Sequence, residues 1–193
     1  MNVTLLEAQH GVKVDLPDNP DTGRQARGDA CIFRPPGMTV YFPGGCPTVC
    51  LHDSREGLCG IIHAGWRSVG EGIIPRFFGL WELFGGTPST TRVTLLPSIG
   101  ACCLSYRVEA FEKDVFPVLQ SRTTLKIVRY LRRDDQGVNL DLIRLIQDLI
   151  SQARYDTPLA PDDCTCCSDD YHCFRCDDKN GQKFRSAAFI AAT

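Results

Sequence analysis

The stretch "GLCGIIHAGWRSVGEG", residues 57–72, joins an apolar run to the start of a helical segment. The apolar run is short and bounded by glycine, which predicts a buried strand. Apolar residues then recur at helical spacing and predict a helix over Val69–Phe84. His63 and Arg67 stand where the two elements meet. Because a purely structural turn needs neither a titratable ring nor a fixed cation, this junction is our first candidate for a functional site.

Further strands and helices follow from local patterns. Short β-branched or aromatic runs between glycine, proline and aspartate predict strands in "VKVDL", "MTVYF", "TVCLHD" and "RVTLL", and "SAAFIAA" predicts a last one. Two more helices are expected over 106–119 and 140–154, the second with Asn139 as its N-cap. Because strands and helices are mixed without strict alternation, we expect an α+β fold, a single-domain α/β sandwich with mixed β-sheets over residues 1–193.

The composition limits the partners. The chain has 43% hydrophobic and 23% charged residues and a net charge of -2, so no broad basic surface is expected and nucleic acid is excluded as a partner. No apolar segment reaches the roughly 18 to 20 residues of a membrane span, and the first residues do not resemble a signal peptide. We therefore expect a cytoplasmic protein without a membrane partner.

The chain has 11 cysteines, an odd count that argues against a complete disulfide framework. Metal ligation or nucleophilic chemistry must then be sought among individual cysteines. His10, Cys46 and His63 have the side chains of a catalytic zinc site with an open fourth position, and each lies at a predicted strand end or turn. Their spacing alone does not separate this reading from two ordinary hydrogen-bonded histidines.

The motifs "QHG", "CPTVCLHD", "HAGWR", "PSIGACC", "NLDL" and "CTCC" followed by "FR" occur in this order. Together they resemble the bacterial laccase-domain family, also described as polyphenol oxidases and as purine nucleoside phosphorylases. The resemblance runs from Gln9 to the C-terminus, with "HAGWR" as its most specific part. It implies that His10, Cys46 and His63 bind zinc.

Three further residues are candidates for the catalytic site. Arg67 carries a permanent charge, can hold a phosphate through two parallel hydrogen bonds and precedes a predicted helix; alternatively it is a solvated surface residue. The resemblance places Cys103 beside the metal, although a buried, inert Cys102–Cys103 pair is the alternative from the residues alone. Arg175 matches one of two adjacent arginines of the family's C-terminal motif, and Cys176 stands at the other position.

The C-terminal cysteines allow a competing interpretation. Cys164 with Cys167 and Cys173 with Cys176 form two C-x-x-C pairs with His172 between them, which is compatible with a small metal knot. The five residues between the pairs are fewer than the roughly 15 to 20 typical of zinc ribbons.

The chain also departs from the family pattern. Nine residues precede His10, where family members carry a longer segment, so part of the usual sheet is expected to be missing. The family's acidic residue before the metal cysteine is Gly45, and the glycine before "PSIG" is Leu96. Losses around metal ligands commonly cost about 10- to 100-fold in affinity or activity, so metal binding is a safer expectation than turnover.

The resemblance implies a zinc-dependent purine nucleoside phosphorylase that acts on adenosine, inosine, guanosine or methylthioadenosine with phosphate. The family is also credited with adenosine deamination. One alternative is a cysteine hydrolase with Cys46 as nucleophile and His63 as base. Another is a degenerate, non-catalytic family member. Copper-dependent phenol oxidation is disfavoured, because a multicopper site needs more histidines than the four present. The sequence gives no oligomeric state.

Overall fold

The computed structural model describes residues 2–16, 24–176 and 188–192. A four-stranded sheet has the order β12-β5-β1-β3. Its strands are β1 (Asn2–Glu7), β3 (Arg24–Arg27), β5 (Gly37–Tyr41) and β12 (Ala188–Ala192). β1 runs parallel to β3 and β5, whereas β12 pairs antiparallel with β5. This sheet is therefore mixed.

A five-stranded sheet has the order β2-β4-β7-β6-β8. Its strands are β2 (Val14–Asp15), β4 (Ala30–Phe33), β6 (Thr48–Asp53), β7 (Leu58–His63) and β8 (Thr91–Leu95). Only the β2–β4 pair is parallel. A small antiparallel sheet has the order β10-β11-β9, with strands β9 (Ser105–Tyr106), β10 (Leu131–Asp134) and β11 (Gly137–Leu140).

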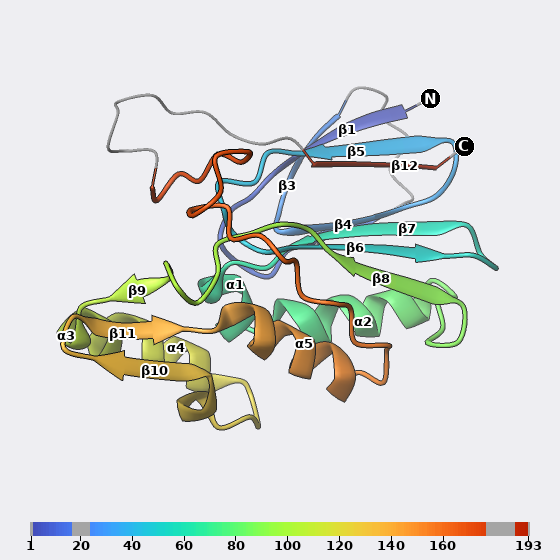
Figure 1. Cartoon of the computed structure of the whole chain (residues 1–193). Helices are drawn as coiled ribbons and strands as arrows, with labels where there is room; N and C mark the ends of the chain where they lie inside the picture. Colours follow the sequence, from blue (N-terminus) through green and yellow to red (C-terminus); the bar gives the residue numbers. More distant parts are fainter. Residues whose placement is uncertain (1, 17–23, 177–187, 193) are drawn as a thin grey trace.

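The main helices are α1 (Trp66–Gly70), α2 (Ile73–Leu83) and α5 (Leu142–Gln152). Between β9 and β10 lie α3 (Val108–Ala110), a π-helical turn (Phe111–Val115), α4 (Phe116–Ser121) and a 3-10 turn (Ile127–Tyr130). In Figure 1 the five-stranded sheet lies between the four-stranded sheet on one side and α2 and α5 on the other. The predicted α/β sandwich with mixed sheets is confirmed.

The central strand β7 is buried along its whole length, which explains its continuous apolar sequence. A small cluster with Leu6, Tyr41 and Ile61 fills the space between the two large sheets. The larger core lies on the helical side and includes Phe77 and Trp81 of α2. Gly60 allows the helix to approach the sheet, because a Cβ there would lie 2.6 Å from Phe77 Cζ.

The strands predicted from short apolar runs are present in the structure. The strands expected in 12–16, 38–42, 48–53, 57–65 and 92–96 are all present, as is the last strand, although residues 186–187 lie outside the described part of the chain. The helix over 69–84 is wrong in one respect: it is two helices, because Gly72 breaks it with a φ of 92°.

Two other helix predictions need correction. The segment 106–119 is not one helix, because its first residues pair as β9 and a π-helical turn separates α3 from α4. Asn139 is not the N-cap of α5, because it pairs with Arg132 of β10 inside β11. The cap is Asp141, whose side chain accepts a hydrogen bond from the Arg144 amide at 3.0 Å.

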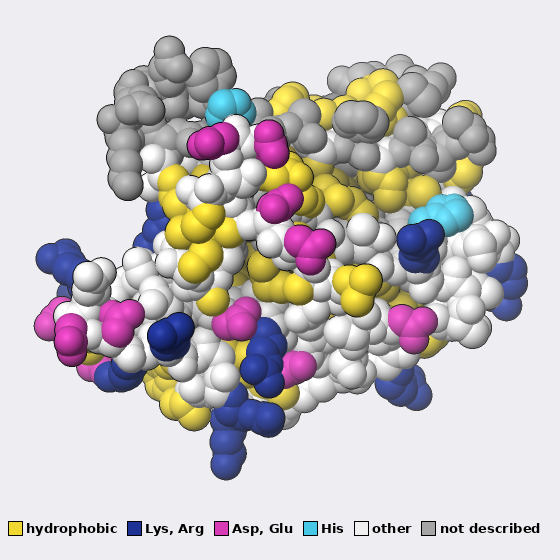
Figure 2. All heavy atoms as spheres, in the orientation of Figure 1, with side chains coloured by type: hydrophobic (Ala, Val, Ile, Leu, Met, Phe, Trp, Pro, Cys, Tyr) yellow, Lys and Arg dark blue, Asp and Glu magenta, His cyan; other side chains and the backbone are white. Residues whose placement is uncertain are grey.

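Acidic and basic side chains are intermixed on the face of the molecule shown in Figure 2. Within the described residues, no helix is both long enough and apolar enough to cross a membrane.

Candidate active site

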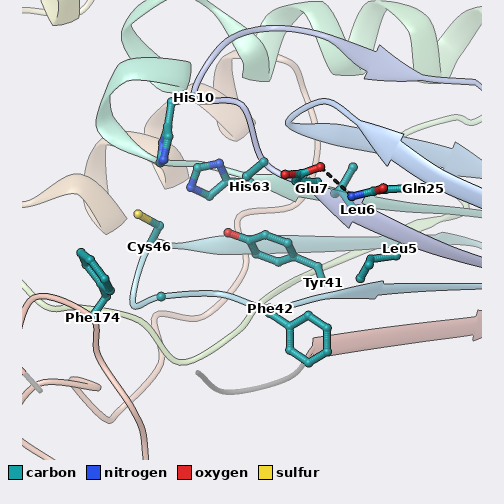
Figure 3. Close-up of a pocket in the computed structure, with 12 residues that line it drawn as sticks. Leu5, Leu6, Glu7, His10, Gln25, Tyr41, Phe42, Cys46, His63 and Phe174 are labelled. Carbon is teal, nitrogen blue, oxygen red and sulfur yellow. Dashed lines mark hydrogen bonds between the residues drawn. The ribbon is translucent and has the colours of Figure 1, made fainter. Parts of the chain in front are cut away.

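Two loops and the end of one strand bring the predicted zinc ligands together at one end of the two large sheets. His63 is the last residue of β7, Cys46 lies between β5 and β6, and His10 follows β1. The imidazole centroids of His10 and His63 are 5.0 Å apart, and Cys46 lies beside His63 (Figure 3). These side chains border a cavity of about 600 Å³. Its other lining residues include Glu7, Gln25, Tyr41, Phe42 and Phe174.

A buried carboxylate that sequence reasoning missed holds this arrangement together. Asp29 lies just before β4 and is fully buried. Its Oδ1 accepts a hydrogen bond from His63 Nδ1 at 2.9 Å and another from Ser68 Oγ at 3.2 Å. Because Nδ1 faces the carboxylate, it carries the proton, and the other ring nitrogen, Nε2, is directed to the Cys46 side (Figure 3).

Asp29 also fixes the backbone of the loop that carries His10. The amides of His10 and Gly11 each donate to its carboxylate at 2.8 Å. His10 has a φ of 57°, a left-handed conformation that costs a residue other than glycine roughly 1 to 2 kcal/mol. The two hydrogen bonds compensate this cost. One carboxylate therefore positions both histidines of the site.

The electrostatics of the site follow from these contacts. Burial lowers the pKa of His63, but hydrogen bonds to Asp29 and Cys46 outweigh it and raise the pKa to about 9. Burial would raise the pKa of Asp29, whereas its bonds to His63 and to the Gly11 amide bring it below the ordinary value. The pKa of His10 is lowered by burial and by the neighbouring His63. His10 therefore loses its proton more readily than His63.

The glycine of "HAGW" leaves space in front of the histidine nitrogen. Gly65 has an ordinary φ of -63°, so its role is not conformational. A Cβ at this position would lie 3.0 Å from His63 Nε2 and 3.6 Å from Cys46 Sγ. The absence of a side chain therefore keeps the space between the two donor atoms open.

The three residues have the chemistry of a zinc site. Two imidazoles and a thiol match its donor preferences, and a carboxylate behind a histidine is the usual support for a ligating imidazole. Among the described residues, two groups of cysteines have donor atoms within 4.8 Å of one another, and His10, Cys46 and His63 are not such a group. Metal ligation would therefore require the three donor atoms to move closer together.

The predicted arginines flank this site. Arg67 is exposed in α1, with its guanidinium 5.3 Å from the Trp66 ring centroid, and its charge contributes to the lowered pKa of His10. Arg175 lies over the Tyr106 ring at 4.6 Å and donates to the Ser105 carbonyl. It lines a second cavity of about 370 Å³ that shares Cys46 and Phe174 with the first.

Cys103 belongs to a group of thiols. Its thiol is 3.3 Å from that of Cys167, and these two form a cluster with Cys102 and Cys164. Cys102 is exposed and Cys103 half-buried, so the alternative of a buried, inert pair is wrong. A cluster of this kind can hold a metal ion. Neither cavity beside Cys46 includes Cys103 in its lining.

The C-terminal cysteines are not grouped as the predicted metal knot requires. Cys164 and Cys167 join the cysteine pair at 102–103, and Cys176 forms a disulfide with Cys166.

The structure also explains why position 45 is a glycine. The φ of Gly45 is 104°, and a Cβ there would lie 2.7 Å from Cys173 Sγ. An acidic side chain at position 45 would not fit against this segment.

The family model described as multi-copper polyphenol oxidoreductase laccase matches residues 1–193. The chain belongs to this family. Its fold is similar to the hypothetical protein YfiH of Bacillus licheniformis, with a TM-score of 0.85 and 20% identity over 99% of this chain and 74% of that one.

Two other solved structures of the same kind are similar in fold. YlmD of Geobacillus stearothermophilus has a TM-score of 0.84 and 22% identity, covering 99% of this chain and 73% of that chain. A Neisseria meningitidis protein described by the family model DUF152 has a TM-score of 0.79 and 18% identity, covering 100% and 75%. No curated protein matches the sequence. At these identities, the structural likeness concerns the fold.

Proposed function

We propose that the protein is a zinc-dependent enzyme that cleaves purine nucleosides with phosphate, and that His10, Cys46 and His63 hold the zinc ion. The observation that carries this proposal is the position of His63. Its Nδ1 is bonded to the buried Asp29, and its Nε2 faces Cys46 across the space that Gly65 leaves open. A bound zinc ion would supply Lewis-acid polarisation at this point.

The cavity suits a planar heterocycle with a polar sugar. Aromatic side chains of Tyr41, Phe42 and Phe174 line it, and Glu7 and Gln25 add hydrogen-bonding groups joined at 2.7 Å. Aromatic rings stack on nucleobases, with about 1 to 3 kcal/mol per base by alanine substitution in single-strand-binding proteins. The aromatic lining therefore supports a nucleoside as substrate.

Phosphorolysis needs an anion site close to the sugar. In the proposed reaction a phosphate oxygen forms a bond to C1′ of the ribose, the C1′–N9 bond breaks, and the base leaves with its electron pair and takes up a proton. Arg67 and Arg175 are the candidate phosphate-binding residues, because a guanidinium pairs with two phosphate oxygens at once. Cys103 is not needed in this scheme, since it lines neither cavity beside Cys46.

The test is a product assay with adenosine. Purified protein with zinc is incubated with and without phosphate, and adenine, ribose 1-phosphate and ammonia are measured. We expect phosphate-dependent adenine release that is lost in His63→Ala and kept in His52→Ala, a histidine on the exposed side of β6. Ammonia without phosphate would indicate deamination. Neither product at saturating nucleoside would favour a non-catalytic protein.

The same geometry supports a second candidate, a cysteine hydrolase. His63 is hydrogen-bonded to Asp29 and to Cys46, so the three residues could act as orienting carboxylate, base and nucleophile of a thiol triad. The two candidates differ in the state of the Cys46 thiol. A zinc-bound thiolate is alkylated slowly until a chelator removes the metal, whereas a free nucleophile is alkylated rapidly with or without the chelator. Mass spectrometry of Cys46 labelling, alongside activity, distinguishes them.

A further inference from the structure

The four thiols of Cys102, Cys103, Cys164 and Cys167 come from two segments more than 60 residues apart in the sequence. We name this group the four-cysteine cluster. All four sulfur atoms lie within 4.8 Å of one another. The residues are exposed or half-buried, so burial in an apolar core does not explain why they gather.

Two sulfur–sulfur distances of the cluster lie within about 0.5 Å of those in a tetrahedral zinc site. Zinc–thiolate bonds of about 2.3 Å place the sulfur atoms at the corners of a tetrahedron with edges of about 3.8 Å. Cys102 Sγ lies 3.7 Å from Cys167 Sγ, and Cys103 Sγ lies 3.3 Å from the same atom. Four thiolates in tetrahedral geometry favour zinc or iron among biological metals.

A backbone amide supports negative charge at one of these sulfur atoms. The Gly100 amide donates to Cys164 Sγ at 3.1 Å. Such bonds compensate thiolate charge that a divalent ion leaves unbalanced.

From these observations we infer that the four-cysteine cluster is a structural zinc site, separate from the site at His10, Cys46 and His63. All four coordination positions would be occupied by protein sulfur, which leaves none for substrate or water and defines a structural rather than a catalytic site. Binding would release the thiol protons to solvent and involve no change of oxidation state.

The site would fasten the C-terminal segment to the body of the fold. Cys164 and Ser98 form an isolated parallel β-bridge, and the Thr165 amide donates to the Ser98 carbonyl at 3.1 Å. The same segment continues to Phe174, whose amide donates to the Gly44 carbonyl at 2.9 Å. A zinc ion at the cluster would therefore stabilise the segment that forms one wall of both cavities next to Cys46.

A second group, Cys166, Cys173 and Cys176, does not support the same inference. It offers three sulfur atoms, and two of them form the Cys166–Cys176 disulfide. It serves instead as a control for thiols that lie close together in the same segment.

The experiment uses the full chain, reduced and freed of metal, and titrated with Co²⁺ and Zn²⁺. Tetrahedral cobalt thiolate has intense visible and near-ultraviolet absorption. We expect this signal in the wild type and in His63→Ala, and its loss in Cys103→Ser and Cys167→Ser. Cys173→Ser and Cys50→Ala, a cysteine on β6 outside both groups, should retain it. Zinc X-ray absorption of His63→Ala should give only sulfur neighbours at about 2.3 Å.

Hydrogen exchange provides a readout besides the spectrum. At zinc about 100-fold above its Kd, local opening of residues 164–167 should be about 100-fold rarer than in the metal-free protein, and Cys167→Ser should abolish this difference. A cobalt signal unchanged in both serine variants would overturn the inference. So would bound iron with inorganic sulfide, or a Cys103–Cys167 disulfide in protein that, once reduced, takes up no metal.

Discussion

Asp29→Asn is the substitution that tests the architecture of the candidate active site most directly. The carboxylate accepts four hydrogen bonds, from the His10 and Gly11 amides, His63 Nδ1 and Ser68 Oγ. Asparagine has the same shape but offers one acceptor atom and one donor group. If its oxygen replaces Oδ1, its amide group faces the Gly11 amide, so that two donors oppose each other.

The magnitude follows from these bonds. A buried donor without a partner costs about 1 to 3 kcal/mol, and the three remaining bonds lose their charge assistance, about 1 kcal/mol each. The expected loss in free energy of unfolding is therefore about 4 to 6 kcal/mol. The His63 ring also loses the negative charge behind Nδ1, so zinc affinity at this site should fall by about 10- to 100-fold.

The pH dependence has a defined sign. In metal-free protein the pKa of His63 is raised from 6.5 to about 9, so its stabilising contribution is complete below pH 6.5 and is lost as pH rises through about 9. The pKa of Asp29 is lowered from 3.8, so its contribution is complete above pH 3.8 and is lost at more acidic pH. Asp29→Asn should reduce both trends.

The assay is urea unfolding with chelator at several pH values, together with zinc titration of the folded protein. Ser68→Ala is the matched control, since it removes one bond to the same carboxylate and should cost about 1 kcal/mol. Unchanged stability and unchanged zinc affinity in Asp29→Asn would refute the assigned role of the carboxylate. A stability loss with unchanged zinc affinity would limit that role to folding.

Three further substitutions test other parts of the structure. Gly65→Ala should lower zinc affinity at His63 at least tenfold with little loss of stability, because its Cβ would stand 3.0 Å from Nε2 while the backbone remains allowed; zinc titration beside urea unfolding measures both. Gly60→Ala should destabilise by about 1 to 3 kcal/mol without changing metal content, since its Cβ would overlap Phe77; equal stability would contradict the packing described. Asp53→Asn should destabilise by about 2 to 4 kcal/mol, because five donors converge on this buried carboxylate. Its hydrogen bonds outweigh burial and hold its pKa well below 3.8, so the difference from wild type in urea unfolding should be complete above pH 3.8 and shrink as pH falls through the lowered pKa.

The local sequence was sufficient to predict elements whose apolar residues are buried in the core. The run 58–63 becomes β7 because every side chain in it enters the core, and the apolar face of 142–152 becomes the buried side of α5. The motif residues His10, Cys46 and His63 could also be chosen from the sequence, through residue type and family resemblance. The fold places all three beside one cavity.

Tertiary structure decided what depends on pairing between distant segments. Nothing local in "RGDAC" marks Asp29 as a buried acceptor, because its four donors come from positions 10, 11, 63 and 68. Asn139 has the residue type of a cap, yet pairing with β10 extends the strand through Leu140 and moves the cap to Asp141. The four-cysteine cluster likewise joins positions 102–103 with 164–167. Spacing along a chain cannot reveal such a group, because the fold alone sets the distance between segments about 60 residues apart.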